Sequence, residues 1–547
     1  MTPVIWLGMA ANLPRYWDCT IIRELLSGEI WTPAGLPTFE HTADPERLER
    51  GCVFIVPGKE WKDRTAELNA LIDRARPCIV FVVKDEACLF PWRKLNLDRC
   101  KLWVQNPDPL KHDGSERAFP VGWTPGTRRL MLNGATDDKP LDWFFSGQVT
   151  HSRRKACAKQ LTTMQGGELI ETKGFTQGIP VEEYLAKMAS CKIAPCPGGV
   201  ITPDSFRAWE ALELGCIPLA DLFGGRGGGE GYWHHLLRCE IPFPLIENWM
   251  EAPHLISELV DSWPHSANRV GAWWAGWKRQ MAHNFMDDLR DVGATEENRP
   301  GDRITVLMPT SSIPSHPSTA IIEETLCSIR RRPELDGCEI IVMCDGLREQ
   351  HKERKADYDE YIRALLVLCK NIPNCYPIVF DTPHHQSGMT KEALKHVRTP
   401  AILYVEHDAP LMGEIPFENL IDAVQGEADV VRLHHEVRVL DCHMLLMPDG
   451  RETKEVAGVP MVRCVQWSQR PHVANTGYYR QILEDHFANS RDPMFIEDRM
   501  HGVVETAWRR HGDAGWHQHR LWMFHPEEPI KRSTHLDGRA GEDKVPG

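Results

Sequence analysis

Short apolar runs alternate with amphipathic stretches along most of the chain. In the first 140 residues this pattern predicts strands at 3–9, 52–57, 78–83 and 102–104 and a helix at 64–76. Strands that alternate with helices are typical of βαβ units in a parallel sheet. We therefore predict an α/β fold, with residues 1–140 as its first lobe.

A second series of the same kind follows a segment rich in Pro, Gly and Asp. It predicts strands at 142–147, 169–170, 191–195 and 216–219, and helices that begin at 152 and span 181–189 and 267–291. Two successive series of this kind indicate a pair of Rossmann-like lobes with a cleft between them. We predict the second lobe at 141–293.

A third α/β pattern begins after a polar segment. Residues 294–303, ATEENRPGDR, are predicted to be a linker because they contain Pro and Gly among charged residues. Beyond them we predict strands at 304–311, 339–344 and 402–405 and helices at 317–331 and 356–370. Residues 304–547 would thus form a separate domain, in agreement with a length of 547 residues that exceeds a single core.

Composition narrows the class of protein. The chain is 42% hydrophobic and 26% charged, with a net charge of −14, which argues against nucleic acid as a partner. No stretch reaches the ~18 apolar residues of a membrane helix, and the N-terminus lacks the basic start of a signal peptide. The 17 cysteines are scattered without metal-type spacing, which favours free thiols and a cytoplasmic location. The oligomeric state is left open.

The strand at 402–405 ends in Glu406-His407-Asp408. Polar residues at the carboxyl end of a buried strand lie where open α/β sheets bind ligands. A carboxylate there can hold Mg²⁺ or Mn²⁺, both of which prefer oxygen ligands. The alternative is an ordinary turn with an acidic cap.

In the first half, the stretch from Pro197 to Pro218 combines features of a phosphate site. Asp204-Ser205 can cap a helix, whose first N–H groups suit a phosphate. On that helix Arg207 offers a fork-shaped cation and Glu210 could accept from ribose hydroxyls. The alternative is a βαβ crossover with a surface Arg–Glu pair.

The order of residues in this stretch resembles the exostosin-like glycosyltransferases, a GT-B family. The matching positions are Pro197, Gly199, Ser205, Arg207, Glu210, Ala211, Gly215 and Pro218, and the segment FFSGQVTHSRRKA at 144–156 is similar to the start of the family's second lobe. The resemblance spans about 142–220 and leaves the catalytic base of this module unassigned. It implies a nucleotide-sugar site formed by Gly147, Arg153, Arg154, Pro197, Gly199, Ser205, Arg207 and Glu210.

The order of polar strand ends in the last 244 residues resembles the GT-A glycosyltransferases, in particular the family 2-like branch. The resemblance implies that Pro309, Thr310, Asp345, Lys391 and Glu406 bind the nucleotide sugar. It assigns Asp408 and His535 to the metal, and Glu497 and Asp498 to the catalytic base. Glu406 departs from the usual Asp. The alternative for Glu497 and Asp498 is that they only begin a helix, whose dipole favours acidic residues at its N-terminus. The alternative for His535 is a histidine in a solvated tail.

The two resemblances together predict a tandem glycosyltransferase, a GT-B-type pair of lobes followed by a GT-A-type domain. It would transfer sugars from UDP-sugars or other nucleotide sugars to a hydroxyl-bearing acceptor, with Mn²⁺ or Mg²⁺ in the second module. Three alternatives remain. Only one module is catalytic, or the protein binds sugar nucleotides without catalysis, or it is a viral enzyme that glycosylates modified DNA bases.

Overall fold

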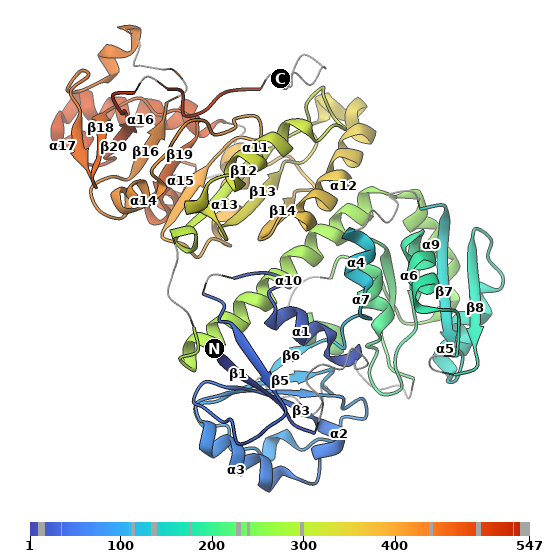
Figure 1. Ribbon diagram of the computed structural model, residues 1–547. Coiled ribbons are helices and arrows are strands. Elements are labelled where there is room, and N and C mark those ends of the chain that lie inside the picture. Colours follow the sequence, from blue (N-terminus) through green and yellow to red (C-terminus); the bar gives the residue numbers. More distant parts are fainter. Residues whose placement is uncertain are drawn as a thin grey trace. The chain divides into compact units, whose positions relative to one another are not determined.

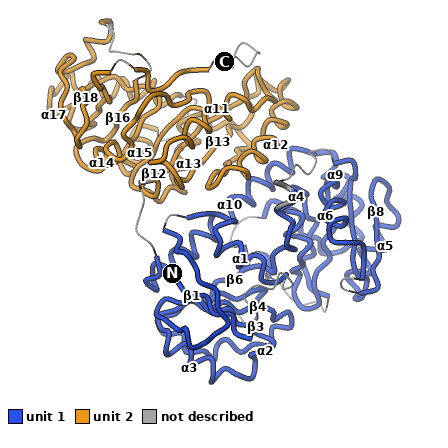
Figure 2. Tube along the Cα trace, viewed as in Figure 1, with its two compact units in different colours: residues 1–296 blue, residues 297–547 orange. Residues whose placement is uncertain are grey.

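The computed structural model describes residues 1–8, 17–33, 35–108, 110, 115–132, 139–174, 177–225, 231–237, 241–295, 300–434, 436, 441–487, 494–528 and 530–536. The chain forms two compact units, Met1–Glu296 and Glu297–Gly547 (Figure 2). Residues 296–299 of the predicted linker lie outside the described residues. The division into four parts, 1–140, 141–293, 294–303 and 304–547, remains a prediction.

The first sheet of unit 1 is parallel throughout, in the order β2-β1-β3-β4-β5-β6 (Figure 1). Its strands are β1 (Thr2–Trp6), β2 (Phe39–Thr42), β3 (Val53–Pro57), β4 (Ile79–Val83), β5 (Lys101–Gln105) and β6 (Arg117–Phe119). Its helices are α1 (Thr20–Leu26), α2 (Gly58–Trp61) and α3 (Thr65–Ala75). Every residue of β3 and β4 is buried, because both faces of a parallel sheet are covered.

The second sheet of unit 1 is also parallel, in the order β11-β10-β9-β7-β8. Its strands are β7 (Leu141–Gln148), β8 (Gly167–Thr172), β9 (Cys191–Cys196), β10 (Ile217–Asp221) and β11 (Leu245–Ile246). Around it lie α4 (Thr127–Leu132), α5 (Ser152–Leu161), α6 (Val181–Ala189), α7 (Phe206–Glu213), α8 (Tyr232–Leu237) and α9 (Ala252–Asp261). The Pro-, Gly- and Asp-rich segment between the two predicted series, residues 105–142, contains β6 and α4, and β2 was not predicted.

A single long helix, α10 (His265–Asp291), contacts both sheets of unit 1 (Figure 1). Near its end, Asp288 accepts a 2.9 Å hydrogen bond from Trp103 Nε1 in β5 and pairs with Arg117 in β6. Near its middle, Lys278 donates to Glu213 of α7. The two sheets therefore share one packing element, and Trp274 of α10 belongs to the core, since it is 1% exposed.

Unit 2 contains one mixed sheet, in the order β14-β13-β12-β15-β19-β16-β20-β18-β17. Its strands are β12 (Ile304–Thr310), β13 (Glu339–Cys344), β14 (Cys375–Val379), β15 (Ala401–Tyr404), β16 (Val430–Leu433), β17 (Lys454–Val456), β18 (Val459–Arg463), β19 (His472–Asn475) and β20 (Leu521–Phe524). Its helices include α11 (Ala320–Arg330), α12 (Lys355–Asn371), α13 (His385–Leu394), α14 (Phe417–Gln425), α15 (Thr476–His486), α16 (Ile496–His511) and α17 (Asp513–Trp516). The predicted fold class, α/β with Rossmann-like parallel sheets followed by a further α/β unit, is confirmed.

Two expectations about the whole chain can be compared with the described residues. Within them, no helix combines the length and apolar character needed to cross a bilayer. The described cysteines are free thiols, and all but Cys100 and Cys327 are buried.

Candidate functional site

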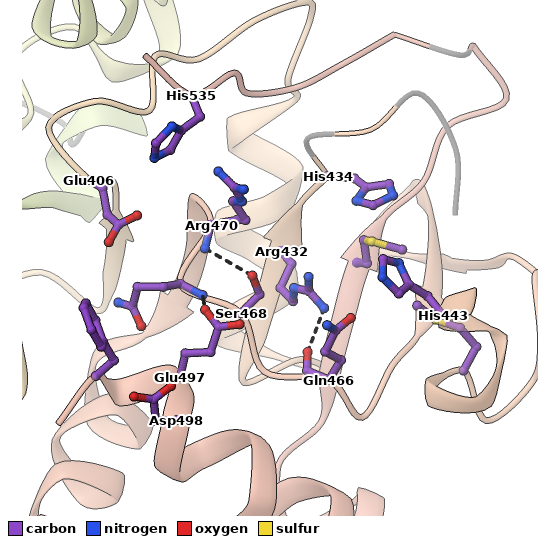
Figure 3. A pocket seen from close by; sticks show the side chains of 14 residues that line it. Glu406, Arg432, His434, His443, Gln466, Ser468, Arg470, Glu497, Asp498 and His535 are labelled. Carbon is purple, nitrogen blue, oxygen red and sulfur yellow. Dashed lines mark hydrogen bonds between the residues drawn. The ribbon is translucent and has the colours of Figure 1, made fainter. Parts of the chain in front are cut away.

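A cavity of about 440 Å³ opens in unit 2 where β15 and β16 end. Figure 3 shows Glu406 and His535 on one side of it, Glu497 and Asp498 below, and His443 on the other side. Segments far apart in the sequence thus contribute to one cavity. Because β16 runs parallel to β15 through the antiparallel β19 between them, both strands deliver their carboxyl ends to the same edge of the sheet.

Glu406 is the first side chain after β15 that faces this cavity. Its Oε1 accepts a 2.7 Å hydrogen bond from Nε2 of Gln386, on α13. Burial raises the pKa of Glu406 to about 7, and the neighbouring charge of Asp408 adds to the effect. The hydrogen bond from Gln386 and the charge of Arg470 oppose the shift.

Asp408 meets His535 because the C-terminal segment runs beside the chain that follows β15. Leu536 N donates to Asp408 O at 2.8 Å, Thr534 N donates to Pro410 O at 3.1 Å, and Leu411 bridges to Ser533 in antiparallel fashion. This pairing brings His535 Nε2 to 3.3 Å from Asp408 Oδ2. The His535 side chain is 40% exposed, and its assignment as a metal ligand rather than a solvated tail histidine remains a prediction.

We tested whether these residues fit a divalent cation. Among the described residues no group of three or more His, Cys, Asp or Glu is arranged to hold a metal. The Asp408–His535 pair nevertheless provides one carboxylate and one imidazole, both partly exposed to solvent. Mg²⁺ and Mn²⁺ sites of this class complete their coordination with substrate phosphates and water, so the pair fits such an ion bound together with a diphosphate.

Glu497 and Asp498 lie in the first turn of α16, and their roles differ. Glu497 Oε2 accepts a 2.9 Å hydrogen bond from the Gln469 backbone N–H, which fixes this carboxylate. Asp498 is exposed, lines the cavity and has no hydrogen bond to another described residue. Of the two, Asp498 has the carboxylate that is available to a ligand.

The other predicted binding residues of unit 2 are not among the residues that line the cavity. Thr310, at the end of β12, exchanges a 3.0 Å hydrogen bond with the Tyr361 hydroxyl, and the Pro309 carbonyl accepts from His407 N. Asp345 Oδ1 accepts from two backbone N–H groups at the start of α13, 2.7 Å from His384 N. Lys391 is half-buried in α13. Their contact with a nucleotide sugar remains a prediction.

Sequence reasoning missed Arg470, which lines the cavity beside Glu406 and His535 (Figure 3). Its charge acts on the Glu406 carboxylate, so the two side chains interact electrostatically. A lone Arg between two apolar runs in the sequence gives no signal of this position. Only the pairing of β19 with β15 and β16 brings it to the edge.

Beneath the cavity, His472 is a fully buried histidine with a defined tautomer. Its Nδ1–H donates to Arg470 O at 2.8 Å, and its Nε2 accepts from the Tyr479 hydroxyl at 3.2 Å. Burial lowers its pKa from 6.5 to about 4. The folded unit therefore holds the neutral form.

We expect unit 2 to lose stability as the pH falls from 6.5 towards 4. In this range His472 binds a proton in the unfolded chain but stays neutral in the folded chain. A shift of this size corresponds to about 3 kcal/mol at most. Urea unfolding at several pH values should show the loss, and a His472→Gln variant should show a smaller slope. An equal slope in the variant would assign the effect to other groups.

In unit 1, Arg154 of α5 and Arg207 of α7 form a cationic pair. Arg207 Nη2 donates to Ser146 O at 2.7 Å, and its guanidinium lies 4.5 Å from the centre of the Phe145 ring. A Cβ at Gly147 would lie 2.5 Å from this Nη2, so the glycine makes room for the cation. Burial, followed by the charge of Arg207, lowers the pKa of Arg154 to about 10.

No described carboxylate forms an ion pair with either member of this pair, whose contacts are with carbonyl groups. Arg154 donates to the carbonyls of Gly198 and Gln148, both at 3.4 Å. The charge of Arg207 makes the charged form of Arg154 less favourable, and an anion bound between the two guanidinium groups would offset this cost. The turn Pro197-Gly198-Gly199 lies beside Arg154, which donates to the Gly198 carbonyl. A Cβ at Gly199 would lie 2.8 Å from Asp204 O, so the turn needs a glycine there.

Two predicted residues of this site make internal contacts instead. Arg153 forms a bidentate ion pair with the fully buried Asp221. Glu210 is 2% exposed, and it accepts from the Tyr184 hydroxyl at 2.6 Å and from both the N–H and the hydroxyl of Thr124.

Ser205 lies at the N-cap of α7, but its hydroxyl makes no capping bond, so the expected cap is wrong in this detail. The preceding Asp204 accepts from Val121 N and from the side chains of Trp209 and Tyr232. No side chain therefore caps α7, and of its first N–H groups Ala208 N donates to Ser205 O at 3.1 Å.

No family model and no curated protein matches the chain. Solved structures similar to it include the mannosyltransferase PcManGT from Pyrobaculum calidifontis in complex with GDP-Man and Mn²⁺, at 15% identity and a TM-score of 0.26, covering 41% of this chain and 54% of that one. TarS 1–349 from S. aureus in complex with UDP-GlcNAc has 15% identity and a TM-score of 0.26, over 42% and 58% of the two chains. The 4-diphosphocytidyl-2C-methyl-D-erythritolsynthase from Anaerococcus prevotii DSM 20548 has 17% identity and a TM-score of 0.25, over 42% and 92%.

The chain spans between half and two thirds of the length of the mannosyltransferase and of TarS 1–349. TM-scores of 0.25 and 0.26 are too low to transfer a function from these structures to this chain.

Proposed function

We propose that the protein is a glycosyltransferase with two nucleotide-sugar sites, one in each unit. The observation that carries this proposal is that Glu406, Asp498 and His535 line one cavity at the carboxyl edge of the unit 2 sheet, with Asp408 3.3 Å from His535. A phosphate-linked donor and a hydroxyl acceptor need a cation site and a free carboxylate close together. We also propose that the first unit is related to the exostosin-like glycosyltransferases and the second to the GT-A glycosyltransferases.

In unit 2, Asp408 and His535 would hold Mn²⁺ or Mg²⁺, which would supply positive charge for the departing diphosphate. Arg470 adds a cation on the same side of the cavity. Asp498 takes the proton from the acceptor hydroxyl as the new glycosidic bond forms. Glu497, held by the Gln469 N–H, orients the first turn of α16.

In unit 1, Arg154 and Arg207 bind the donor diphosphate between the N-terminal ends of α5 and α7. Helix N-termini add N–H groups and a favourable dipole for this anion. Arg153 stabilises the fold through Asp221. Glu210 contacts the ribose only if it exchanges its bond to Thr124 or Tyr184.

A second candidate is that only unit 2 is catalytic and unit 1 binds a sugar or nucleotide as an accessory. The hydrogen bonds from Thr124 and Tyr184 to Glu210 favour this reading, because they occupy the carboxylate that the proposal places beside the arginine pair.

The variants Asp408→Asn and Arg207→Met separate these candidates. We expect Asp408→Asn to abolish Mn²⁺-stimulated hydrolysis and transfer in unit 2. We expect Arg207→Met to weaken donor binding by unit 1 about tenfold or more, the effect of one charged hydrogen bond. Radiolabelled GDP-mannose and UDP-GlcNAc serve as first donors, with thermal shift as the binding readout.

Glu418→Gln on α14 and Lys159→Met on α5 are controls, because both change an exposed charge outside the two sites. If only Asp408→Asn loses turnover while Arg207→Met loses donor binding, unit 2 is the catalytic unit and unit 1 only binds the donor, which is the second candidate. Full Mn²⁺-stimulated turnover in Asp408→Asn would refute the metal site.

A further inference from the structure

Arg432 lies in a row of side chains that crosses the unit 2 sheet. It pairs in register with His472 of β19, which pairs with Tyr404 of β15, and on its other side it pairs with Met523 of β20. Residues opposite one another on neighbouring strands share one face of a sheet. The row therefore leads from the strand that precedes Glu406 to the far end of the cavity.

The guanidinium of Arg432 is a buried cation without a carboxylate. The residue is 5% exposed, yet it lines the cavity, and its Nη1 donates to Gln466 O at 2.7 Å. Its Nε has no hydrogen-bond partner. No acidic residue in the described part of the chain forms an ion pair with it. Burying an unpaired charge is strongly unfavourable, so a cavity ligand that supplies the counter-charge would be bound tightly.

This end of the cavity is separate from the end that would hold the donor. β16 is two strands from β15, which corresponds to about 10 Å at the usual strand spacing. Figure 3 shows Arg470 next to Glu406 and His535, whereas Arg432 lies between that group and His443. Arg470 is thus the arginine at the donor end.

The other residues that line the Arg432 end of the cavity suit a sugar with an acidic group. His434 and His443 offer imidazole groups, and Met447 and Met523 offer apolar thioethers. Imidazoles can donate to hydroxyls or anionic oxygens, while thioethers pack against the apolar face of a ring. Asp498 borders the same cavity, so the proposed base and the Arg432 end open into one space.

We propose that the Arg432 end of the cavity is the acceptor subsite and that the acceptor is an acidic sugar residue, with a carboxylate or phosphate paired to Arg432. This assignment rests on the proposed function of unit 2, which it extends from a hydroxyl acceptor to an anionic one. Arg432 acts here as a binding residue, and the transfer chemistry stays with Asp498.

Calorimetry on the whole 547-residue chain, without donor or metal, tests the subsite directly. Methyl β-D-glucuronide and glucose 6-phosphate are compared with methyl β-D-glucoside, their neutral counterpart, and with inorganic phosphate. We expect at least one acidic sugar to bind about tenfold to a hundredfold more tightly than the neutral glycoside, the effect of one charge-assisted pair. We expect Arg432→Met to abolish the difference and Arg432→Lys to restore part of it.

Arg520→Met is the matched control, because it removes a cation that pairs with Asp429 and does not line the cavity. It should retain the preference for the acid. Thermal unfolding of each variant, and its UDP and GDP binding, show that the unit is folded and the donor end intact.

Several results would overturn the proposal. Equal affinity for the acidic and neutral sugars would remove the anionic acceptor. Phosphate binding as tight as that of the acidic sugars would show an anion site without sugar recognition. Displacement of the glucuronide by UDP or GDP, with loss of nucleotide affinity in Arg432→Met, would assign Arg432 to the donor. Acid binding without any nucleotide binding would keep the subsite but refute the proposed transferase.

Discussion

Replacing Asp498 by Asn is expected to lower the rate of sugar transfer by unit 2 about 10²- to 10⁴-fold, the usual contribution of a general base. Donor binding should be unchanged, because in the proposed reaction Asp498 acts on the acceptor hydroxyl, whereas Asp408 and His535 hold the metal. The measurement is kcat at saturating donor and acceptor, with the donor Kd from thermal shift. Glu505→Gln, on the same helix but outside the cavity lining, is the control.

A contrary result would exchange the roles of two neighbouring carboxylates. If Asp498→Asn kept its activity and Glu497→Gln lost it, Glu497 would be the base and its bond to Gln469 N would have to open during the reaction. A loss in both variants with a lower unfolding temperature would indicate damage to the first turn of α16.

The second large effect concerns the stability of unit 1. Glu213→Gln should destabilise this unit by about 3 kcal/mol or more, because it leaves Lys278 as a buried cation without its partner. Glu213 Oε1 accepts from Lys278 Nζ at 2.5 Å and from Trp274 Nε1 at 2.8 Å, and both Glu213 and Lys278 are less than 10% exposed. Burial already lowers the pKa of Lys278, and Glu213 opposes that shift.

The double variant Glu213→Gln/Lys278→Met should regain most of this stability, since it removes the unpaired charge. Chemical unfolding monitored by fluorescence is the measurement, and only the transition of unit 1 should move. A double variant as unstable as the single one would show that packing around Trp274, rather than charge, limits stability. A shift of both transitions would contradict independent unfolding of the units.

Many elements could be predicted from local sequence. The helix Val181–Ala189 and the strand Glu339–Cys344 occur at the predicted residues, because their apolar spacing and flanking residues act within a few positions. Gly215 follows α7 with a φ of +69°, as expected for a glycine that ends a helix. β2 and β6 were missed because they are edge strands with weak apolar patterns.

The neighbours of each functional side chain could not be read in this way. Arg153 and Arg154 are adjacent in sequence, yet successive side chains leave a helix about 100° apart, so one meets Asp221 and the other meets the carbonyl of Gly198. Arg432 resembles any polar residue in a strand until β19 and β20 flank it and bury it.

The sequence by itself therefore determined the α/β elements, their order and the positions of polar strand ends. The tertiary structure alone decided which of those polar groups meet: the pairing of residues 532–536 with 408–412 puts His535 on Asp408, and internal donors close around Glu210. The physical reason is range. Periodicity and turn chemistry act over a few residues, whereas the partner of a charge depends on segments that packing brings together from far along the chain.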